Sequence, residues 1–107
     1  MIEKLYNFTI TNDKRIERVI DEDLAAINHM VLPTGERLPL HNANSNVYMI
    51  VVRGTITLIL GEQEAHHYPT GSILAIPFRT LMNVSNTHAE IAEIFVVKTP
   101  GPRVMPQ

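Results

Sequence analysis

The chain has 107 residues, 45% of them hydrophobic and 19% charged, which supplies the core of one domain and leaves no room for a second. Nine basic and eleven acidic residues give a formal net charge of −2, which argues against a nucleic-acid-binding surface. Cysteine is absent, so disulfides, thiol nucleophiles and zinc–thiolate sites are excluded. Histidine and carboxylate side chains are the strong metal ligands that remain.

The longest apolar run covers residues 47–52 and is far shorter than the roughly 20 residues of a membrane-spanning helix. The first residues do not have the pattern of a signal peptide. We therefore expect a soluble cytoplasmic protein that has neither a membrane nor a nucleic acid as partner.

Short runs rich in Val, Ile and aromatic residues are separated by glycines and prolines, which is typical of an all-β sandwich or barrel. In chain order, these predicted strands cover residues 4–10, 24–32, 47–52, 55–60, 72–76 and 91–98. Hydrophobic residues between 16 and 27 also fit a helical stripe, but the acidic residues 21–23 favour two strands joined by a turn. Three prolines in residues 99–107 predict a flexible tail.

The run 47–52 is apolar at every position, so both faces of this predicted strand need to be covered. Further apolar residues in 24–32 and 91–97 exceed what the interior of one small sandwich needs. This surplus predicts a homodimer that is formed through an outer sheet face.

Two spaced patterns stand out in the middle of the chain. The first places Gly35, His41, Ala43, Val47 and Gly54 at intervals of five, one, three and six residues. The second places its members at intervals of five, one, two and three residues; they are Gly71, Pro77, Arg79, Met82 and Asn86. These intervals, and the spacer 55–70 between them, resemble the two motifs of a small single-domain cupin.

The resemblance implies a single cupin domain over residues 1–107, with its motif core at 35–86. Its implied fold class is all-β, an antiparallel jelly-roll barrel or sandwich. Cupins hold a divalent metal on two His and one Glu of the first motif and one His of the second. Those positions here are His41, Ala43, Val47 and Met82, so the metal-binding motifs are degenerate. Ala and Val have no lone pair, and a thioether is too soft for an Fe, Mn or Ni site.

We therefore predict no cofactor and an apolar barrel cavity that binds a small apolar or weakly acidic molecule. His41 is its expected polar contact, unless that side chain simply bonds a neighbouring Asn or a backbone carbonyl. Arg79, in the glycine position of the second motif, is a candidate receptor for a carboxylate. The predicted ligand-binding residues are His41, Ala43, Val47, Met49, Met82 and Val84.

Two other functions stay open at this point. One is an enzyme of isomerase or dioxygenase type, with His41 as acid and base or with Ni, Zn, Fe or Mn on an irregular site formed by His41 and His29. The other is a structural, oligomer-forming domain. Of the remaining histidines, His66 and His67 point to opposite faces of an extended segment and are expected at a rim, and His88 is expected in a solvated turn.

Overall fold

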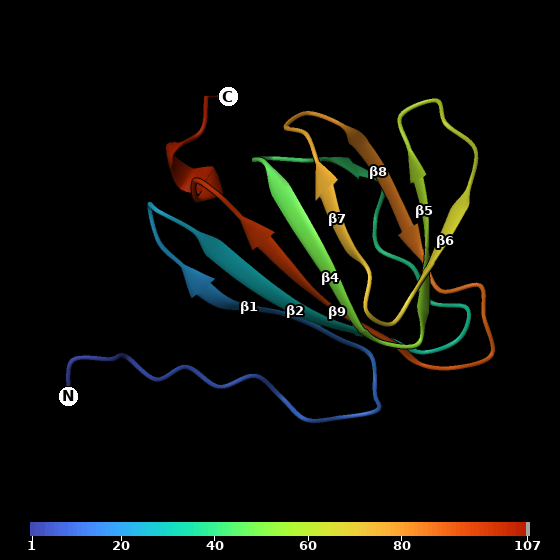
Figure 1. Ribbon diagram of the computed structural model, residues 1–107, viewed down its shortest axis with the longest axis horizontal. Coiled ribbons are helices and arrows are strands. Elements are labelled where there is room, and N and C mark those ends of the chain that lie inside the picture. Colours follow the sequence, from blue (N-terminus) through green and yellow to red (C-terminus); the bar gives the residue numbers. More distant parts are fainter. Residues whose placement is uncertain (107) are drawn as a thin grey trace.

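The computed structural model describes residues 1–106 and consists of antiparallel strands in two facing sheets (Figure 1). One sheet has the order β1-β2-β9-β4-β7, and the other has the order β3-β8-β5-β6. This arrangement confirms the predicted all-β jelly-roll fold. The strands are β1 (Arg15–Asp21), β2 (Ala26–Leu32), β3 (His41–Asn42), β4 (Val47–Arg53), β5 (Thr55–Leu60), β6 (His66–Pro69), β7 (Ile73–Ile76), β8 (Leu81–Ser85) and β9 (Ala92–Lys98).

The core lies between the two sheets and follows the two-residue period of the strands. In β4, Val47, Met49 and Val51 are buried, whereas Tyr48 and Val52 point outward and are exposed. Every second residue of β9 is buried in the same way. The core therefore takes one face of each strand, and the apolar outer face of β4 is left to the surface.

The strand-turn-strand interpretation of residues 16–27 is confirmed. β1 and β2 pair antiparallel, with Asp21 opposite Ala26, and the Glu22 N–H donates to the Ala25 carbonyl across the turn at 2.9 Å. The predicted runs at 24–32, 47–52, 55–60, 72–76 and 91–98 are all strands, to within two residues at either end. Strands β3, β6 and β8 were not among the predicted runs.

The predicted strand at 4–10 is wrong. This segment has no ladder partner within residues 1–106, and it runs extended along the body instead (Figure 1). The ring of Phe8 packs on the rings of His29 and Phe95, with centroids 4.7 and 4.9 Å away. Its aromatic side chain therefore holds the segment over the outer sheet face, rather than at a sheet edge where strand pairing would occur.

The expected flexible tail at 99–107 is also corrected, because most of it packs against the body. The buried Gly101 donates its N–H to the Asp23 carbonyl at 2.9 Å, and a Cβ there would overlap the Glu22 carbonyl oxygen. A short 3-10 helix, η1 (Pro102–Val104), follows, and Arg103 forms a salt bridge to Asp23 at 2.6 Å. Gln107 lies outside the described residues. Among residues 1–106, no helix is long and apolar enough to cross a membrane.

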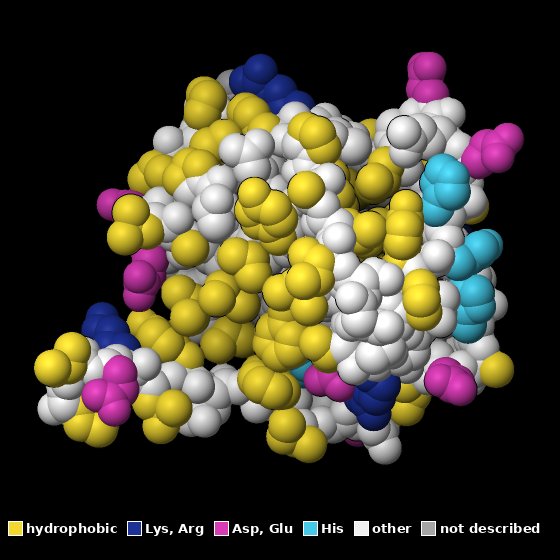
Figure 2. Space-filling model, viewed as in Figure 1, with side chains coloured by type: hydrophobic (Ala, Val, Ile, Leu, Met, Phe, Trp, Pro, Cys, Tyr) yellow, Lys and Arg dark blue, Asp and Glu magenta, His cyan; other side chains and the backbone are white. Residues whose placement is uncertain are grey.

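The outer face of the five-stranded sheet carries one apolar row that crosses every strand. Its members lie opposite one another in the sheet register; they are Ile20, Ile27, Val97, Tyr48 and Ala75. Tyr48 is 46% exposed, and Ile73 beside this row is 67% exposed. In Figure 2, hydrophobic side chains gather over this sheet.

The homodimer stays a prediction, and this row is where we expect it to form. Light scattering coupled to size exclusion should give twice the chain mass for the wild type. Tyr48→Lys with Ile73→Lys should give a single chain, because two buried ammonium groups would oppose association. The matched control is Leu81→Lys, which changes an exposed apolar residue of the other sheet. A wild type with the mass of one chain at every concentration would contradict the prediction.

Candidate functional site

The six predicted ligand-binding residues line one hollow at the open end of the barrel. The complete lining is Met30, Leu38, His41, Ala43, Asn44, Val47, Met49, Met82, Val84, Val96 and Lys98. The hollow measures about 30 Å³. A hollow of that size has room for little more than water, so the barrel interior is packed rather than open. The resemblance thus located the lining, and the side chains fill most of the space that a ligand would need.

His41 lies at the mouth of this hollow and is exposed. Its Nδ1 is 2.8 Å from the Pro39 carbonyl oxygen, which can only accept, so Nδ1 is the protonated nitrogen. Of the two sequence interpretations, the hydrogen bond to a backbone carbonyl is confirmed, and a His41 buried in an apolar pocket is wrong. The Nε2 atom keeps its lone pair for another partner.

The residues of the barrel interior do not fit a divalent metal. Ala43, Val47 and Met82 are at most 3% exposed and lie in the hollow beside His41, where the cupin ligand positions are expected. An alanine and a valine offer no donor atom, and a thioether is a poor ligand for hard or borderline ions. Within residues 1–106, no three His, Cys, Asp or Glu side chains are grouped so that they could hold a metal ion.

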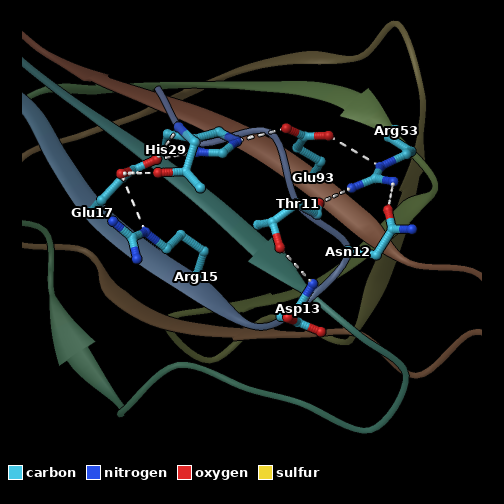
Figure 3. A network of polar contacts seen from close by, with 9 residues as sticks. Thr11, Asn12, Asp13, Arg15, Glu17, His29, Arg53 and Glu93 are labelled. Atoms are coloured by element: carbon cyan, nitrogen blue, oxygen red, sulfur yellow. Dashed lines mark hydrogen bonds and ion pairs between the residues drawn. The ribbon is translucent and has the colours of Figure 1, made fainter. Parts of the chain in front are cut away.

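The alternative site of His41 with His29 is wrong, because the two side chains lie on opposite faces of the five-stranded sheet. His29 is fully buried on the outer face, where its ring contacts Phe8 and Phe95. Its Nδ1 lies 2.7 Å from Glu17 Oε2, and its Nε2 lies 2.6 Å from Glu93 Oε2 (Figure 3). Both ring nitrogens are therefore occupied, and an imidazole bonds two carboxylates in this way only by donating from both nitrogens.

This network fastens the N-terminal segment to the sheet. Glu17 accepts from the backbone N–H and the hydroxyl of Thr9, at 2.8 and 2.9 Å. Arg53 forms a salt bridge to Glu93 at 3.0 Å and donates hydrogen bonds to Asn12 Oδ1 and the Thr11 carbonyl (Figure 3). His29 therefore has a structural role.

A second hollow, which sequence reasoning missed, adjoins the first. We call it the basic cleft; it measures about 240 Å³ and is lined by Arg18, Asp21, Ala26, Asn28, Asn44, Lys98, Pro102 and Arg103. Asn44 and Lys98 line both hollows. Arg18, Asn28 and Lys98 point to the inner side of the sheet, since Arg18 pairs with Asn28 and Lys98 follows the buried Val96 at the two-residue period. No motif marks these residues, and only the strand register could have found them.

The basic cleft holds one cation without a carboxylate partner. Arg18 forms a salt bridge to Asp21 at 3.3 Å, and Arg103 forms one to Asp23. Among the residues that the structure describes, Lys98 forms no salt bridge. Burial, followed by the charge of Arg18, lowers the pKa of the Lys98 ammonium, and Asp21 acts in the opposite direction. An anion in the cleft would stabilise the charged ammonium and so offset the effects of burial and of Arg18 on this pKa.

Asn28 adds an unused acceptor to the same cleft. Within residues 1–106, its buried Oδ1 atom has no hydrogen-bond partner. Buried polar atoms are seldom left unpaired, so a donor group is expected there when the cleft is filled.

Arg79 lies at the rim rather than in the barrel hollow. Its φ is +72°, in the left-handed region that favours glycine, which explains why the matching cupin position is a glycine. The Arg79 N–H donates to the Ala43 carbonyl at 2.8 Å, and the guanidinium lies over the Phe78 ring at 4.7 Å. Arg79 lines a shallow hollow that shares Ala43 and Asn44 with the barrel mouth.

Comparison with known proteins places this fold in a family. An uncharacterized protein of Methanocaldococcus jannaschii is 42% identical over 104 residues, which are 96% of this chain and 90% of the relative. A crystal structure from the same organism, described as an RmlC-like cupin family protein with a double-stranded β-helix fold, superposes with a TM-score of 0.93. That structure is 42% identical, and the match covers 96% of this chain and 95% of the other. The chain belongs to the RmlC-like cupin family.

More distant solved structures share the fold alone. An RmlC-like cupin protein of Desulfovibrio desulfuricans has a TM-score of 0.76 at 20% identity, over 92% of this chain and 97% of the other. A Klebsiella pneumoniae protein with a double-stranded β-helix domain has a TM-score of 0.76 at 15% identity, over 90% of this chain and 84% of the other. No protein-family model matches the chain. None of these names states an activity, so the function of this cupin has to be argued from its own residues.

The polar network of Glu17, His29 and Glu93 on the outer sheet face predicts how the stability of this cupin depends on pH. Hydrogen bonds from the Thr9 backbone and then from His29 lower the pKa of Glu17 from its ordinary value of 4.5 to about 2. Because the pKa is lower in the folded state, the stabilisation is complete above about pH 4.5 and is lost as the pH falls towards 2. Glu17→Gln should unfold at lower urea concentration near neutral pH, and it should lose less further stability on acidification than the wild type.

Glu36→Gln is the matched control, because Glu36 forms an exposed salt bridge to Lys14 and should change stability little. Equal urea midpoints for Glu17→Gln and Glu36→Gln near neutral pH would show that the network does not stabilise the fold.

The cupin alignment predicts that a metal site can be restored in the barrel. The variant with Ala43→His, Val47→Glu and Met82→His should be less stable than the wild type by about 2 kcal/mol or more without metal, because it buries polar groups in the packed hollow. Added Ni²⁺ should raise its melting temperature beyond any response of the wild type. The same variant with His41→Ala should show a smaller rise in melting temperature. Equal metal responses in all three proteins would mean that these positions do not converge.

Proposed function

We propose that this cupin binds a small organic acid at the mouth of the barrel, with the carboxylate on Lys98. The observation that carries the proposal is the position of Lys98, a half-buried cation that borders both hollows and forms no salt bridge within residues 1–106. A carboxylate beside the ammonium would form a charge-assisted hydrogen bond and would balance the repulsion from Arg18.

The shape of the site supports a short ligand with one polar end. The barrel hollow is too small to take a molecule, whereas the basic cleft has room for a few heavy atoms. A carboxylate in the cleft would leave the rest of the molecule at the apolar rim of the barrel mouth, beneath which Ala43, Val47 and Val96 lie buried. Methionines at 30, 49 and 82 would let this rim adjust, because their side chains are flexible.

Two further groups favour an acid that carries a second polar group. The unpaired Oδ1 of Asn28 would accept a hydrogen bond from a hydroxyl next to the carboxylate. Arg79 is held in a backbone conformation that costs an ordinary residue about 1 kcal/mol, and strain of this kind often marks a functional position. Arg79 lines a hollow that shares Ala43 and Asn44 with the barrel mouth, and its charge would attract anions to that end of the molecule.

Proton transfer on such an acid is a second candidate function. It is favoured by His41, whose Nε2 lone pair is free at the barrel mouth while Nδ1 is fixed on Pro39. Turnover of a bound acid that is lost in His41→Gln, while binding is kept, would support an isomerase-type activity over binding alone.

The binding proposal is tested by NMR titration with butyrate, 2-hydroxybutyrate and uncharged butyramide. Backbone amide signals of β9 and of residues 43–47 should shift with the two acids and not with the amide. Lys98→Met, which keeps the apolar stem, should weaken binding by about tenfold or more, and Lys98→Arg should retain most of it. Binding should also weaken at alkaline pH, as the lowered pKa of Lys98 removes its charge.

The matched control is Lys14→Met, which removes an exposed lysine of the same chain. Equal affinity for butyrate and butyramide, or equal losses in Lys98→Met and Lys14→Met, would contradict a carboxylate site at Lys98.

A further inference from the structure

A pair of histidines, His67 and His88, lies on the outer face of the four-stranded sheet, away from the barrel mouth. The register of β5 with β6 places Thr57 opposite His67, and the register of β5 with β8 places Thr57 opposite Ser85. The chain then turns after β8 and brings Thr87 and His88 back over Thr57. In Figure 2, histidine side chains gather over this part of the molecule, near β5 and β6.

The turn that delivers His88 is built by Asn86, the last residue of the second cupin motif. Asn86 is buried, and its amide donates to the Leu32 and Glu90 carbonyls at 2.8 and 2.7 Å. Its Oδ1 accepts from the His88 N–H at 2.9 Å. A buried side chain therefore fixes the backbone of His88, which is not simply a solvated turn residue.

The two imidazoles point at the same place. His67 Nδ1 lies 2.9 Å from Thr57 Oγ1, and His88 Nε2 lies 3.1 Å from the same oxygen. The two nitrogens are 3.3 Å apart, and the rings stand at 89° to each other. Thr57 is buried, and its hydroxyl is also 2.9 Å from Thr87 Oγ1.

The geometry points to a two-histidine site for a borderline divalent ion such as Zn²⁺, Ni²⁺ or Cu²⁺. Two imidazole nitrogens that each lie about 2.0 to 2.1 Å from a tetrahedral ion are about 3.4 Å apart, so the pair already has the spacing of ligands. Neutral imidazole selects ions of this group over Mg²⁺ or Ca²⁺, which prefer oxygen. No carboxylate hydrogen-bonds to either ring within residues 1–106, so water would complete the coordination.

The surroundings suit reversible binding. His67 is exposed and His88 half-buried, which leaves the ion an open path from solvent. The Thr57 hydroxyl, supported by Thr87, is 2.9 and 3.1 Å from the two nitrogens and would lie directly beside the ion. Both imidazoles have to be neutral to coordinate, so binding should weaken as the buffer is acidified.

Isothermal titration with ZnCl₂ tests the site, with His66→Ala as the matched control. His66 is the preceding residue, on the opposite face of β6, so its loss removes one imidazole from the same strand and leaves the pair intact. We expect one Zn²⁺ per wild-type chain, and roughly tenfold or greater loss of affinity in His67→Ala and in His88→Ala. His66→Ala and His41→Ala should bind as the wild type does.

Melting curves without metal will identify any variant that fails to fold, and His67→Gln, which keeps a polar side chain against Thr57, then replaces His67→Ala. Absence of Zn²⁺ binding at millimolar concentration would overturn the proposal. Equal losses in His66→Ala and His67→Ala would also overturn it, because they would show scattered binding to surface histidines.

Discussion

The two sheets differ in width, and this difference determines where the basic cleft forms. Five strands face four, and the core fills the space where the sheets overlap. The outermost strand β1 lies beyond this overlap, where even its inward-facing Ile16 is 50% exposed. Polar residues that point inward at that end, Arg18, Asn28 and Lys98, line the basic cleft together with Pro102 and Arg103 of η1. The basic cleft follows directly from this mismatch, because a barrel closed along its whole length would have needed apolar residues there.

Ala43, Val47 and Met82 are buried and make the barrel interior a packed apolar core. Side chains now occupy most of the space, which moves any ligand outward to the mouth. There Lys98 presents a charge, and within residues 1–106 neither His41 Nε2 nor Asn28 Oδ1 has a hydrogen-bond partner. These groups are the basis of the proposed carboxylate site, and Ala43, Val47 and Met82 supply no suitable donors for a metal in the barrel.

The sequence predicted the fold class, most strand positions and the residues that line the barrel, because strand period and motif spacing are local signals. It did not predict that the lining would nearly close, since side-chain volume in a core depends on the distance between sheets. The facing of His29 was open for a related reason: parity could not be counted across Pro33 and Gly35, and only the pairing with Phe95 shows that it points outward. Lys98 was overlooked because a charged residue at the end of an apolar strand usually marks the point where the strand leaves the core. That the Lys98 side chain points inward is known only from the register of the strand. His67 and His88 come together through long-range pairing and the Asn86 turn, which no local pattern reveals.

A crystal structure of this cupin with 2-hydroxybutyrate would show whether a carboxylate binds to Lys98 at the barrel mouth. We expect a carboxylate oxygen within hydrogen-bond distance of Lys98 Nζ, the hydroxyl on Asn28 Oδ1, and the carbon chain at the barrel mouth beside Asn44. A ligand bound elsewhere, or a ligand in the cleft whose carboxylate turns away from Lys98, would contradict it.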